Sequence, residues 1–416
     1  MASANRRAAF RLYGTHTCAF LLLSAATLLL SACGNFFSCE GKESCPCATG
    51  VTSTTTNPCG GTTGTGTSTG AGSSTDDYAY VGNSATSAND VDGYNLGSGT
   101  LTAATSAPFS FGYSPTAMVV TLADTFLYAA SDSELNTTNP GAGYIYGYSL
   151  GTGGALSILD SGTPLESESV TSLAVSPDGD WLFCLDTNGL TLEEYSIDTS
   201  TGALTFETTY GINGATGAEI TPSSVAIAPS GDFLVVTLGT AGAETFSLNE
   251  TTGAAAAVTI VSPTNAATGI YAAAIDANDN LYLAGTDSLS VYSTTAAGTP
   301  TLLNSYSTGT GTAHSVVVNS ASTYVYVGNE SLGAIYGFSI GTSAALTALA
   351  GSPFTGPTSV DALAFDSTSA YLIASGYNAS TGIQLFSIGS AGALSSVGTA
   401  GTGTSDIIPG AIATTH

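Results

Sequence analysis

A short apolar motif recurs seven times between residues 76 and 416. Each copy is a run of five residues rich in aromatic and aliphatic side chains, as in Leu127-Tyr128-Ala129-Ala130-Ser131. The equivalent residues of the seven copies, spaced 48, 55, 52, 47, 44 and 47 residues apart, are Tyr80, Tyr128, Phe183, Val235, Tyr282, Tyr326 and Ile373. A repeat of this length, built on strand-forming residues, predicts one β-sheet blade for each copy.

Each copy also carries the other strands of a four-stranded blade. A nearly all-apolar segment precedes the motif, as in Ser172-Leu173-Ala174-Val175-Ser176, and is expected to be an innermost strand buried on both faces. A later segment such as Tyr195-Ser196-Ile197 is followed by a glycine turn, Thr201-Gly202-Ala203-Leu204. No stretch has helical periodicity. The chain is therefore predicted to be all-β, a seven-bladed β-propeller of four-stranded antiparallel blades.

The two ends of the repeat region complement each other. The first copy begins directly at Tyr78-Ala79-Tyr80-Val81, with no innermost strand before it. A matching strand stands at the other end, where Pro409-Gly410-Ala411-Ile412-Ala413-Thr414 aligns with the segment from Pro222 to Ile227. The C-terminal strand is therefore predicted to pair into the N-terminal blade, which leaves no open edge in the ring.

The first 32 residues have the pattern of a secretory signal. Three arginines precede an apolar run over residues 19–30, which is shorter than the roughly 20 residues that a membrane-spanning helix needs. The run ends in Leu30-Ser31-Ala32-Cys33-Gly34, which resembles a bacterial lipobox, where cleavage precedes a cysteine that is then acylated. We expect lipidation of Cys33 and an anchor in the cell envelope, at the outer membrane. An ordinary cleaved signal is the alternative.

Residues 33–75 are rich in Thr, Gly and Ser and are expected to form a tether. Its cysteines, which suggest two disulfides in an oxidising compartment, are Cys39, Cys45, Cys47 and Cys59. A metal site is the alternative, although the spacing lacks the paired C-x2-C units of common zinc sites. Cys184 stands in an apolar strand and is expected to be a buried thiol.

Basic residues are nearly absent from the chain that follows the signal. Lys42 is its only Lys or Arg, against 30 Asp and Glu, which gives a net charge of about −29. Nucleic acid is not expected as a partner, because its binding depends on Lys and Arg that release counterions. Anionic lipid surfaces are disfavoured for the same reason. The acidity is typical of a solvated, self-repelling surface; adaptation to an acidic or cation-rich exterior is the alternative.

The repeat unit resembles the lactonase-like and YVTN-type seven-bladed β-propellers over residues 76–416. The copy from Val170 to Phe206 carries the resemblance best, with Ser176-Pro177-Asp178-Gly179 and Thr201-Gly202-Ala203-Leu204. This family includes 6-phosphogluconolactonases, lactonizing enzymes and exported propellers without an established activity. A phosphosugar lactonase needs cationic side chains to hold the phosphate. Because no Lys or Arg follows Lys42, a phosphorylated substrate is not expected.

One position of the repeat, directly before each innermost strand, is expected to lie at the mouth of the central channel. Its residues in successive copies are Thr116, Thr171, Ser223, Tyr271, His314, Asp361 and Pro409. His314 and Asp361 would occupy neighbouring blades, where a carboxylate could orient an imidazole that acts as a general base on water. The alternative is that both are solvent-exposed or hydrogen-bonded loop residues.

These features favour a monomeric envelope propeller that binds a neutral glycan, a peptide or an envelope protein and needs no cofactor. The alternative is a hydrolase of uncharged lactones that uses His314 with Asp361, where a divalent cation could assist. A purely structural envelope component is a third possibility. Asp178-Gly179-Asp180 and the segment from Asp276 to Asn280 are calcium-like in composition, but both are expected to be hairpin turns, so no metal site is predicted there.

Overall fold

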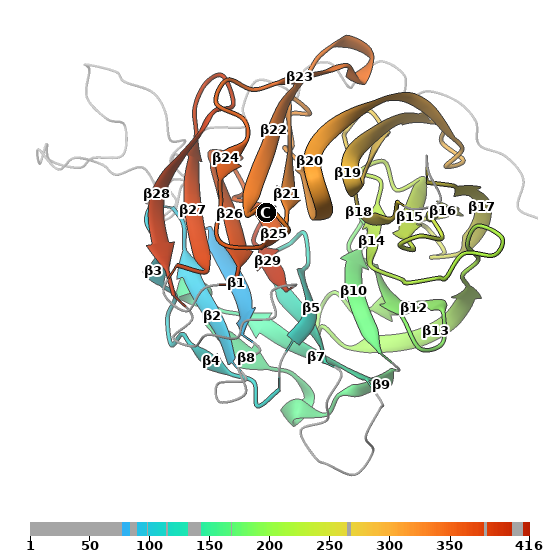
Figure 1. Cartoon of the computed structure of the whole chain (residues 1–416). Helices are drawn as coiled ribbons and strands as arrows, with labels where there is room; N and C mark the ends of the chain where they lie inside the picture. Colours follow the sequence, from blue (N-terminus) through green and yellow to red (C-terminus); the bar gives the residue numbers. More distant parts are fainter. Residues whose placement is uncertain are drawn as a thin grey trace, which may run out of the picture. The chain divides into compact units, whose positions relative to one another are not determined.

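Antiparallel β-sheets surround a central channel in the computed structural model of the chain (Figure 1). The structure describes residues 77–83, 90–97, 99–113, 115–131, 143–167, 169–263, 268–377, 381–401 and 411–416. The signal over residues 1–32, Cys33, the four cysteines of the tether and Pro409 lie outside the described residues. Within the described ranges, no helix has the length and apolar character needed to cross a membrane.

Blades one to four each have four antiparallel strands, and the first two carry a short extra strand. Blade one consists of β29 (Ile412–Thr414), β1 (Tyr78–Asn83), β2 (Asp90–Asn95), β3 (Thr102–Ala103) and β4 (Phe109–Ser110). Blade two consists of β5 (Pro115–Val120), β6 (Phe126–Ser131), β7 (Gly143–Leu150), β8 (Leu156–Ile158) and β9 (Leu165–Ser167), with the short 3-10 helices η1 (Thr152–Gly154) and η2 (Asp160–Gly162). Blade three consists of β10 (Val170–Val175), β11 (Trp181–Asp186), β12 (Thr191–Ile197) and β13 (Leu204–Gly211). Blade four consists of β14 (Ser224–Ile227), β15 (Phe233–Thr237), β16 (Ala243–Leu248) and β17 (Ala255–Val261).

Blades five and six share one sheet, whereas the sequence predicts a separate sheet for each blade. Its strands are β18 (Ile270–Ile275), β19 (Asn280–Thr294), β20 (Pro300–Val318), β21 (Tyr324–Asn329), β22 (Ala334–Ile340), β23 (Leu346–Ala348) and β24 (Phe354–Thr355), with the 3-10 helix η3 (Thr342–Ala344). The sheet is continuous because residues 300–307 of β20 pair with β19, while residues 313–318 pair with β21. Blade seven is again separate and consists of β25 (Val360–Phe365), β26 (Tyr371–Gly376), β27 (Ile383–Ile388) and β28 (Leu394–Ala400). The predicted all-β, seven-bladed architecture is confirmed.

The innermost strands contact one another around a closed ring. In order they are β29, β5, β10, β14, β18, the second half of β20 and β25, which contacts β29 again. The sequence predicts innermost strands that are buried on both faces. This prediction is wrong, since these strands are only partly buried. The second strands, such as β6 and β15, are the ones buried along their whole length. The reason is that an innermost strand packs against the sheets on one side and borders the channel on the other.

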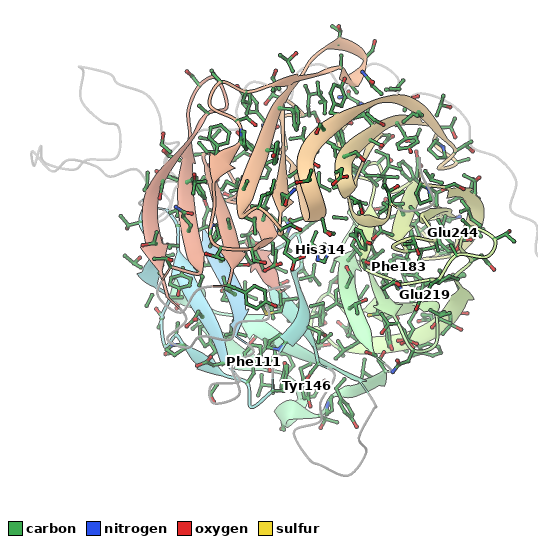
Figure 2. All side chains as sticks on the ribbon, in the orientation of Figure 1. Phe111, Tyr146, Phe183, Glu219, Glu244 and His314 are labelled. Carbon is green, nitrogen blue, oxygen red and sulfur yellow. The ribbon has the colours of Figure 1, made fainter. Side chains whose placement is uncertain are left out.

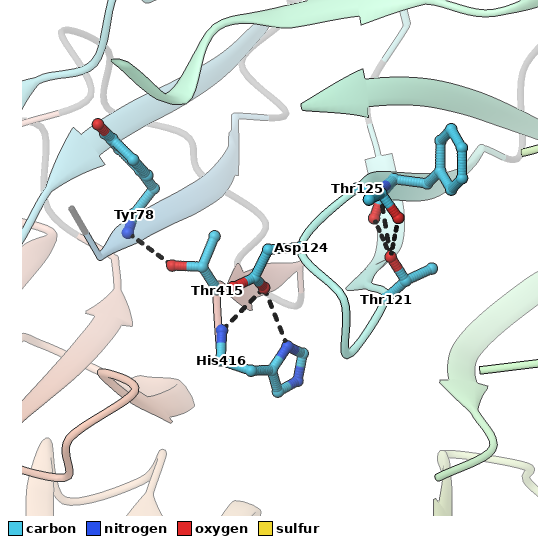
Figure 3. Close-up of polar contacts among 7 residues, drawn as sticks. Tyr78, Thr121, Asp124, Thr125, Thr415 and His416 are labelled. Carbon is cyan, nitrogen blue, oxygen red and sulfur yellow. Dashed lines mark hydrogen bonds and ion pairs between the residues drawn. The ribbon is translucent and has the colours of Figure 1, made fainter. Parts of the chain in front are cut away.

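The C-terminal strand completes the first blade, as the sequence predicts. In β29, Ile412 and Thr414 stand opposite Val81 and Ala79 of β1. Figure 3 shows the end of this pairing, where the Tyr78 amide donates to the Thr415 hydroxyl at 2.9 Å. The His416 amide donates to the Asp124 carboxylate, in the β5–β6 turn of blade two, also at 2.9 Å. The chain end is thus held by two blades.

Each blade also contacts the outer hairpin of the next blade through the first residue of its second strand. At six junctions this residue is aromatic and lies against a glycine with positive φ; the pairs are Tyr78 with Gly154, Phe126 with Gly202, Trp181 with Gly253, Phe233 with Gly298, Tyr324 with Gly392 and Tyr371 with Gly99. A Cβ added to Gly202 would come within 2.6 Å of the Phe126 ring. Between blades five and six the equivalent residues are Asn280 and Ala344, where no aromatic ring needs the space. This contact explains the glycine of the recurrent Thr-Gly-Ala-Leu turn.

Gly202→Ala is expected to lower the free energy of unfolding by about 3 kcal/mol, because a side chain at φ +75° costs about 1–2 kcal/mol and the Phe126 ring must also move. Gly179→Ala is the matched control, since Gly179 has φ +82° with nothing within 4 Å of an added Cβ. We expect it to cost only about 1–2 kcal/mol. Denaturant titration measures both, and equal losses would contradict a role for the ring contact.

Candidate functional site

The six described candidate residues line one cavity of about 290 Å³ at one end of the central channel. They are Thr116, Thr171, Ser223, Tyr271, His314 and Asp361. The rest of the wall comes from Ser172, Ser224, Ser315, Ala362, Leu363 and Ile412. Figure 2 shows His314 near the centre of the ring of blades. Because hydroxyl, imidazole and carboxyl groups dominate the lining, this end of the channel is a polar pocket and not an apolar plug.

A break in strand pairing directs most of these side chains into the channel. In five of the innermost strands the pairing shifts at the candidate residue, so that this residue has no direct partner on the second strand; the residues are Thr116, Thr171, Tyr271, His314 and Asp361. A bulge of this kind bends the strand and changes the direction of the side chain at that point. The repeat therefore builds the pocket by placing a bulge at the equivalent position of five of the seven blades.

Three of the six Ser and Thr hydroxyl groups of the wall join neighbouring blades. The Thr116 hydroxyl donates to the Val170 carbonyl at 2.6 Å, which connects blades two and three. The Ser315 hydroxyl accepts from the Leu363 amide at 3.0 Å, which connects blades six and seven. Such groups keep the ring together, so the chemistry of the pocket depends on the ionisable side chains of blades six and seven.

His314 and Asp361, which line the pocket, lie beside Glu330. His314 lies in β20, Glu330 directly follows β21, and Asp361 lies in β25 of the next blade. The His314 Nε2 is 3.6 Å from the Glu330 Oε2. One nitrogen or oxygen atom of each residue lies within 4.8 Å of the others. Among the described residues, these three alone form a group that could hold a metal ion.

Asp361 is the most perturbed acid of the group. Its Oδ2 atom is buried without a hydrogen-bond partner. Burial and, to a smaller extent, the nearby Glu330 charge together raise the pKa of Asp361 to about 8, while a hydrogen bond from Ser359 opposes the shift. Strong perturbation of a buried carboxyl in a pocket is a property typical of functional sites.

Two tyrosines border the charged group. The Tyr271 ring lies 5.2 Å from the His314 ring, centroid to centroid, at an angle of 32°. Tyr377 is 39% exposed, and its pKa is raised by burial and then by the charges of Asp361 and Glu330. An aromatic face and a phenol therefore stand beside the carboxylates, on blades five and seven.

Known structures resemble this one closely in fold and weakly in sequence. A candidate 6-phosphogluconolactonase from Bacteroides uniformis is 15% identical, with a TM-score of 0.67 over 82% of this chain and 99% of that one. The periplasmic gluconolactonase of Pseudomonas aeruginosa is 14% identical, with the same TM-score and coverage. No protein-family model and no curated protein matches the sequence. The fold is a lactonase-like β-propeller. Identities this low establish the fold and leave the activity open.

Glu330 is the site residue that the sequence interpretation of this lactonase-like propeller missed. It follows the second strand of its blade and so lies outside the repeat position that contains His314 and Asp361. The corresponding residues after other second strands include Thr187, Thr286 and Tyr377. Tyr377 is within electrostatic reach of the same pocket. An alignment of this second position would have shown Glu330 beside His314.

The opposite end of the channel of this lactonase-like propeller differs in character. A cavity of about 480 Å³ there is lined mainly by the apolar far ends of β18, β20 and β25, and by the last three residues, Thr414 to His416. Thr415 in this wall is the residue that bonds to Tyr78, where the chain enters the propeller. The ionisable cluster therefore lies at one mouth, and β1 begins and β29 ends at the other.

Proposed function

We propose that this protein is a lipid-anchored propeller of the cell envelope that binds a small uncharged ligand rich in hydroxyl groups at the His314 pocket. The observation that carries the proposal is a polar cavity of about 290 Å³ lined by His314 and Asp361, with Glu330 grouped beside these two residues. Concave pockets with a few convergent polar groups are typical of small-molecule sites, whereas a protein partner needs a broad surface.

The charges of the pocket support an uncharged ligand. Glu330 would repel an anion, as would Asp361 once it loses its proton, and no Lys or Arg follows Lys42 to offset them. Carboxylate oxygens accept hydrogen bonds from ligand hydroxyls. The Tyr271 ring offers an apolar face beside them, which suits the C–H face of a sugar ring.

The lipobox at Leu30-Ser31-Ala32-Cys33-Gly34 supports the anchor, and a similar structure is described as that of a periplasmic protein. Lipidation of Cys33 would hold the protein on a membrane. Cys33→Ser is expected to move the protein from the membrane fraction to the soluble fraction of the host cell envelope. Equal partition of the two forms would contradict the anchor.

A hydrolase of uncharged lactones is the second candidate, and the contact between His314 and Glu330 favours it. The carboxylate would orient the imidazole, which takes a proton from water while the hydroxide attacks the lactone carbonyl. The ring C–O bond then breaks, and the imidazolium returns its proton to the alkoxide that leaves, which yields a hydroxy acid. The sequence pairs His314 with Asp361; the structure adds Glu330 as a second carboxylate partner.

One panel separates the two functions. Uncharged sugars and their lactones are tested by calorimetry for binding and by proton release for turnover. The double variant His314→Ala with Asp361→Asn is expected to weaken binding at least tenfold and, for the hydrolase, to abolish turnover. His416→Ala is the control, because His416 also contacts a carboxylate but lies at the other mouth. Binding without turnover favours the binding module. If the native protein shows neither binding nor turnover of any member of the panel, both proposed functions are refuted.

A further inference from the structure

Two carboxyl groups lie together at the His314 pocket without a fixed positive charge near them. Asp361 and Glu330 come from neighbouring blades, and each has an oxygen within 4.8 Å of the other's. No Lys or Arg follows Lys42, so neither carboxylate can form an ion pair with one. His314, 3.6 Å from Glu330, is the one basic side chain of the group. Two negative charges held this close inside a pocket repel each other strongly unless a proton or a metal cation lies between them.

The Asp361 side chain has an unused coordination position. It is the buried member of the group and lines the pocket. Its Oδ2 is inaccessible to solvent and has no hydrogen-bond partner. A buried carboxylate oxygen without a partner costs free energy, which a bound cation would recover. The other surface His–carboxylate pair, His416 with Asp124, has no such third member among the described residues.

The spacing of the three groups fits a small metal ion. Two ligands at about 2.0–2.2 Å from a tetrahedral ion are about 3.3–3.6 Å apart. The His314 and Glu330 atoms are already 3.6 Å apart. The separations within the group reach at most 4.8 Å, so rotation of a side chain closes the difference. Each ligand also stands on a strand or at a strand end, where the sheet fixes the backbone.

The kinds of ligand select the class of metal. Ca²⁺ and Mg²⁺ prefer oxygen ligands only, whereas an imidazole nitrogen suits Zn²⁺ and its neighbours in the first transition row. One imidazole and two carboxylates leave at least one coordination position that faces the cavity. Three protein ligands with an open position are typical of Zn²⁺ sites that receive a water or a substrate oxygen.

We propose that His314, Glu330 and Asp361 bind one divalent transition-metal ion of the Zn²⁺ class, and that this ion joins blades six and seven at the mouth of the pocket. The ion supplies the positive charge that the chain otherwise lacks there. This metal site rests on the proposed function and extends it, because the open coordination position of the ion would take a hydroxyl or carbonyl oxygen of the ligand. The ion itself binds without the ligand.

The test uses the full chain that follows the signal, treated with a chelator and then titrated with Zn²⁺ in a calorimeter. The cysteines replaced by serine to remove competing thiol ligands are Cys33, Cys39, Cys45, Cys47 and Cys59. We expect one Zn²⁺ per chain and a rise in the unfolding temperature, since a ligand at 100 times its Kd stabilises the folded state by about 2.7 kcal/mol. Ca²⁺ at the same concentration should neither displace Zn²⁺ nor raise that temperature.

Four single variants identify the site. His314→Ala, Glu330→Gln and Asp361→Asn are each expected to weaken Zn²⁺ binding at least tenfold, whereas His416→Ala leaves it unchanged. Far-ultraviolet circular dichroism checks that each variant is folded. Equal Zn²⁺ binding by the native chain and the three pocket variants would overturn the proposal. Absence of Zn²⁺ binding, or a preference for Ca²⁺, would overturn it as well.

The metal site and the proposed ligand site can fail separately. Sugar binding that persists in chelator-treated protein without any Zn²⁺ binding refutes the metal site and supports the ligand site. Stoichiometric Zn²⁺ binding lost in Asp361→Asn, without binding of any member of the sugar and lactone panel, supports the metal site and refutes the ligand proposal.

Discussion

Deletion of residues 407–416 is expected to leave a chain that does not fold. The deletion removes β29, so that β1 becomes an open edge and blade one loses its innermost strand. Tyr80, which is fully buried in a cluster that includes Ala411 and Ala413, would become exposed on one side. A ring that cannot close loses contacts at two blade junctions, a loss comparable to the roughly 5–15 kcal/mol that stabilises a whole domain.

Solubility on expression and the unfolding transition of the purified protein measure the effect of the deletion. Deletion of His416 alone is the matched control, because β29 remains and only the exposed contact with Asp124 is lost. We expect that control to cost less than about 1 kcal/mol. A soluble chain lacking residues 407–416 that unfolds at the native temperature would refute the closure by β29.

The second large effect is a gain of stability as the pH falls from 7 to 4. Burial and, to a smaller extent, the neighbouring Asp90 charge together raise the pKa of Asp92 to about 6. Burial also raises the pKa of Glu194 and of Glu244. In the unfolded chain these groups return to about 4. Between the two values the folded protein holds protons that the unfolded chain has lost, so stability is greatest below about pH 4 and declines as the pH rises. The contribution of Asp92 is lost by about pH 6, and that of Asp361, whose pKa is raised to about 8, is lost by about pH 8.

At about 1.4 kcal/mol per pH unit, Asp92 alone accounts for about 2–3 kcal/mol of this change. Denaturant midpoints at pH 4, 5, 6 and 7 measure it. Asp92→Asn is expected to flatten the slope between pH 4 and 6 and to raise stability at pH 7, since the buried Asp92 Oδ2 has no hydrogen-bond partner to lose. Asp198→Asn is the control, because Asp198 is exposed and its hydrogen bonds with Ser200 lower its pKa. A flat profile for the native protein would contradict adaptation to an acidic exterior.

Most of the fold could be predicted from the sequence because each blade has to bury a strand at the same position of its sheet. The buried second strand must be apolar along its whole length, which makes residues such as Leu127 and Tyr128 visible in every copy. No innermost strand precedes Tyr78, whereas a matching strand follows Pro409. The C-terminal strand was therefore expected to complete the first blade and close the ring. The fusion of blades five and six was not predictable, since Gly309 and Gly311, which both have positive φ and indicate a turn in the sequence, lie inside one continuous strand over 300–318.

The pocket was predictable only in part. The position that contains His314 and Asp361 repeats with the blades, so its residues could be grouped before their contacts were known. The bulge that turns each of these side chains into the channel depends on strand pairing, which composition does not show. Glu330 stands 16 residues after His314 and meets it only because β20 and β21 are adjacent. The hydroxyls that join blades, such as Thr116, look in the sequence like ligand-binding residues.

The place where the chain enters the propeller also determines how the molecule can be attached to a surface. Tyr78 bonds to Thr415, and Thr415 lines the apolar mouth at the opposite end of the channel from His314 (Figure 3). A chain that arrives there does not have to pass over the His314 mouth. A surface attached to the chain next to Tyr78 would therefore lie at the mouth away from His314, and the entrance to the polar pocket would stay accessible to molecules in solution.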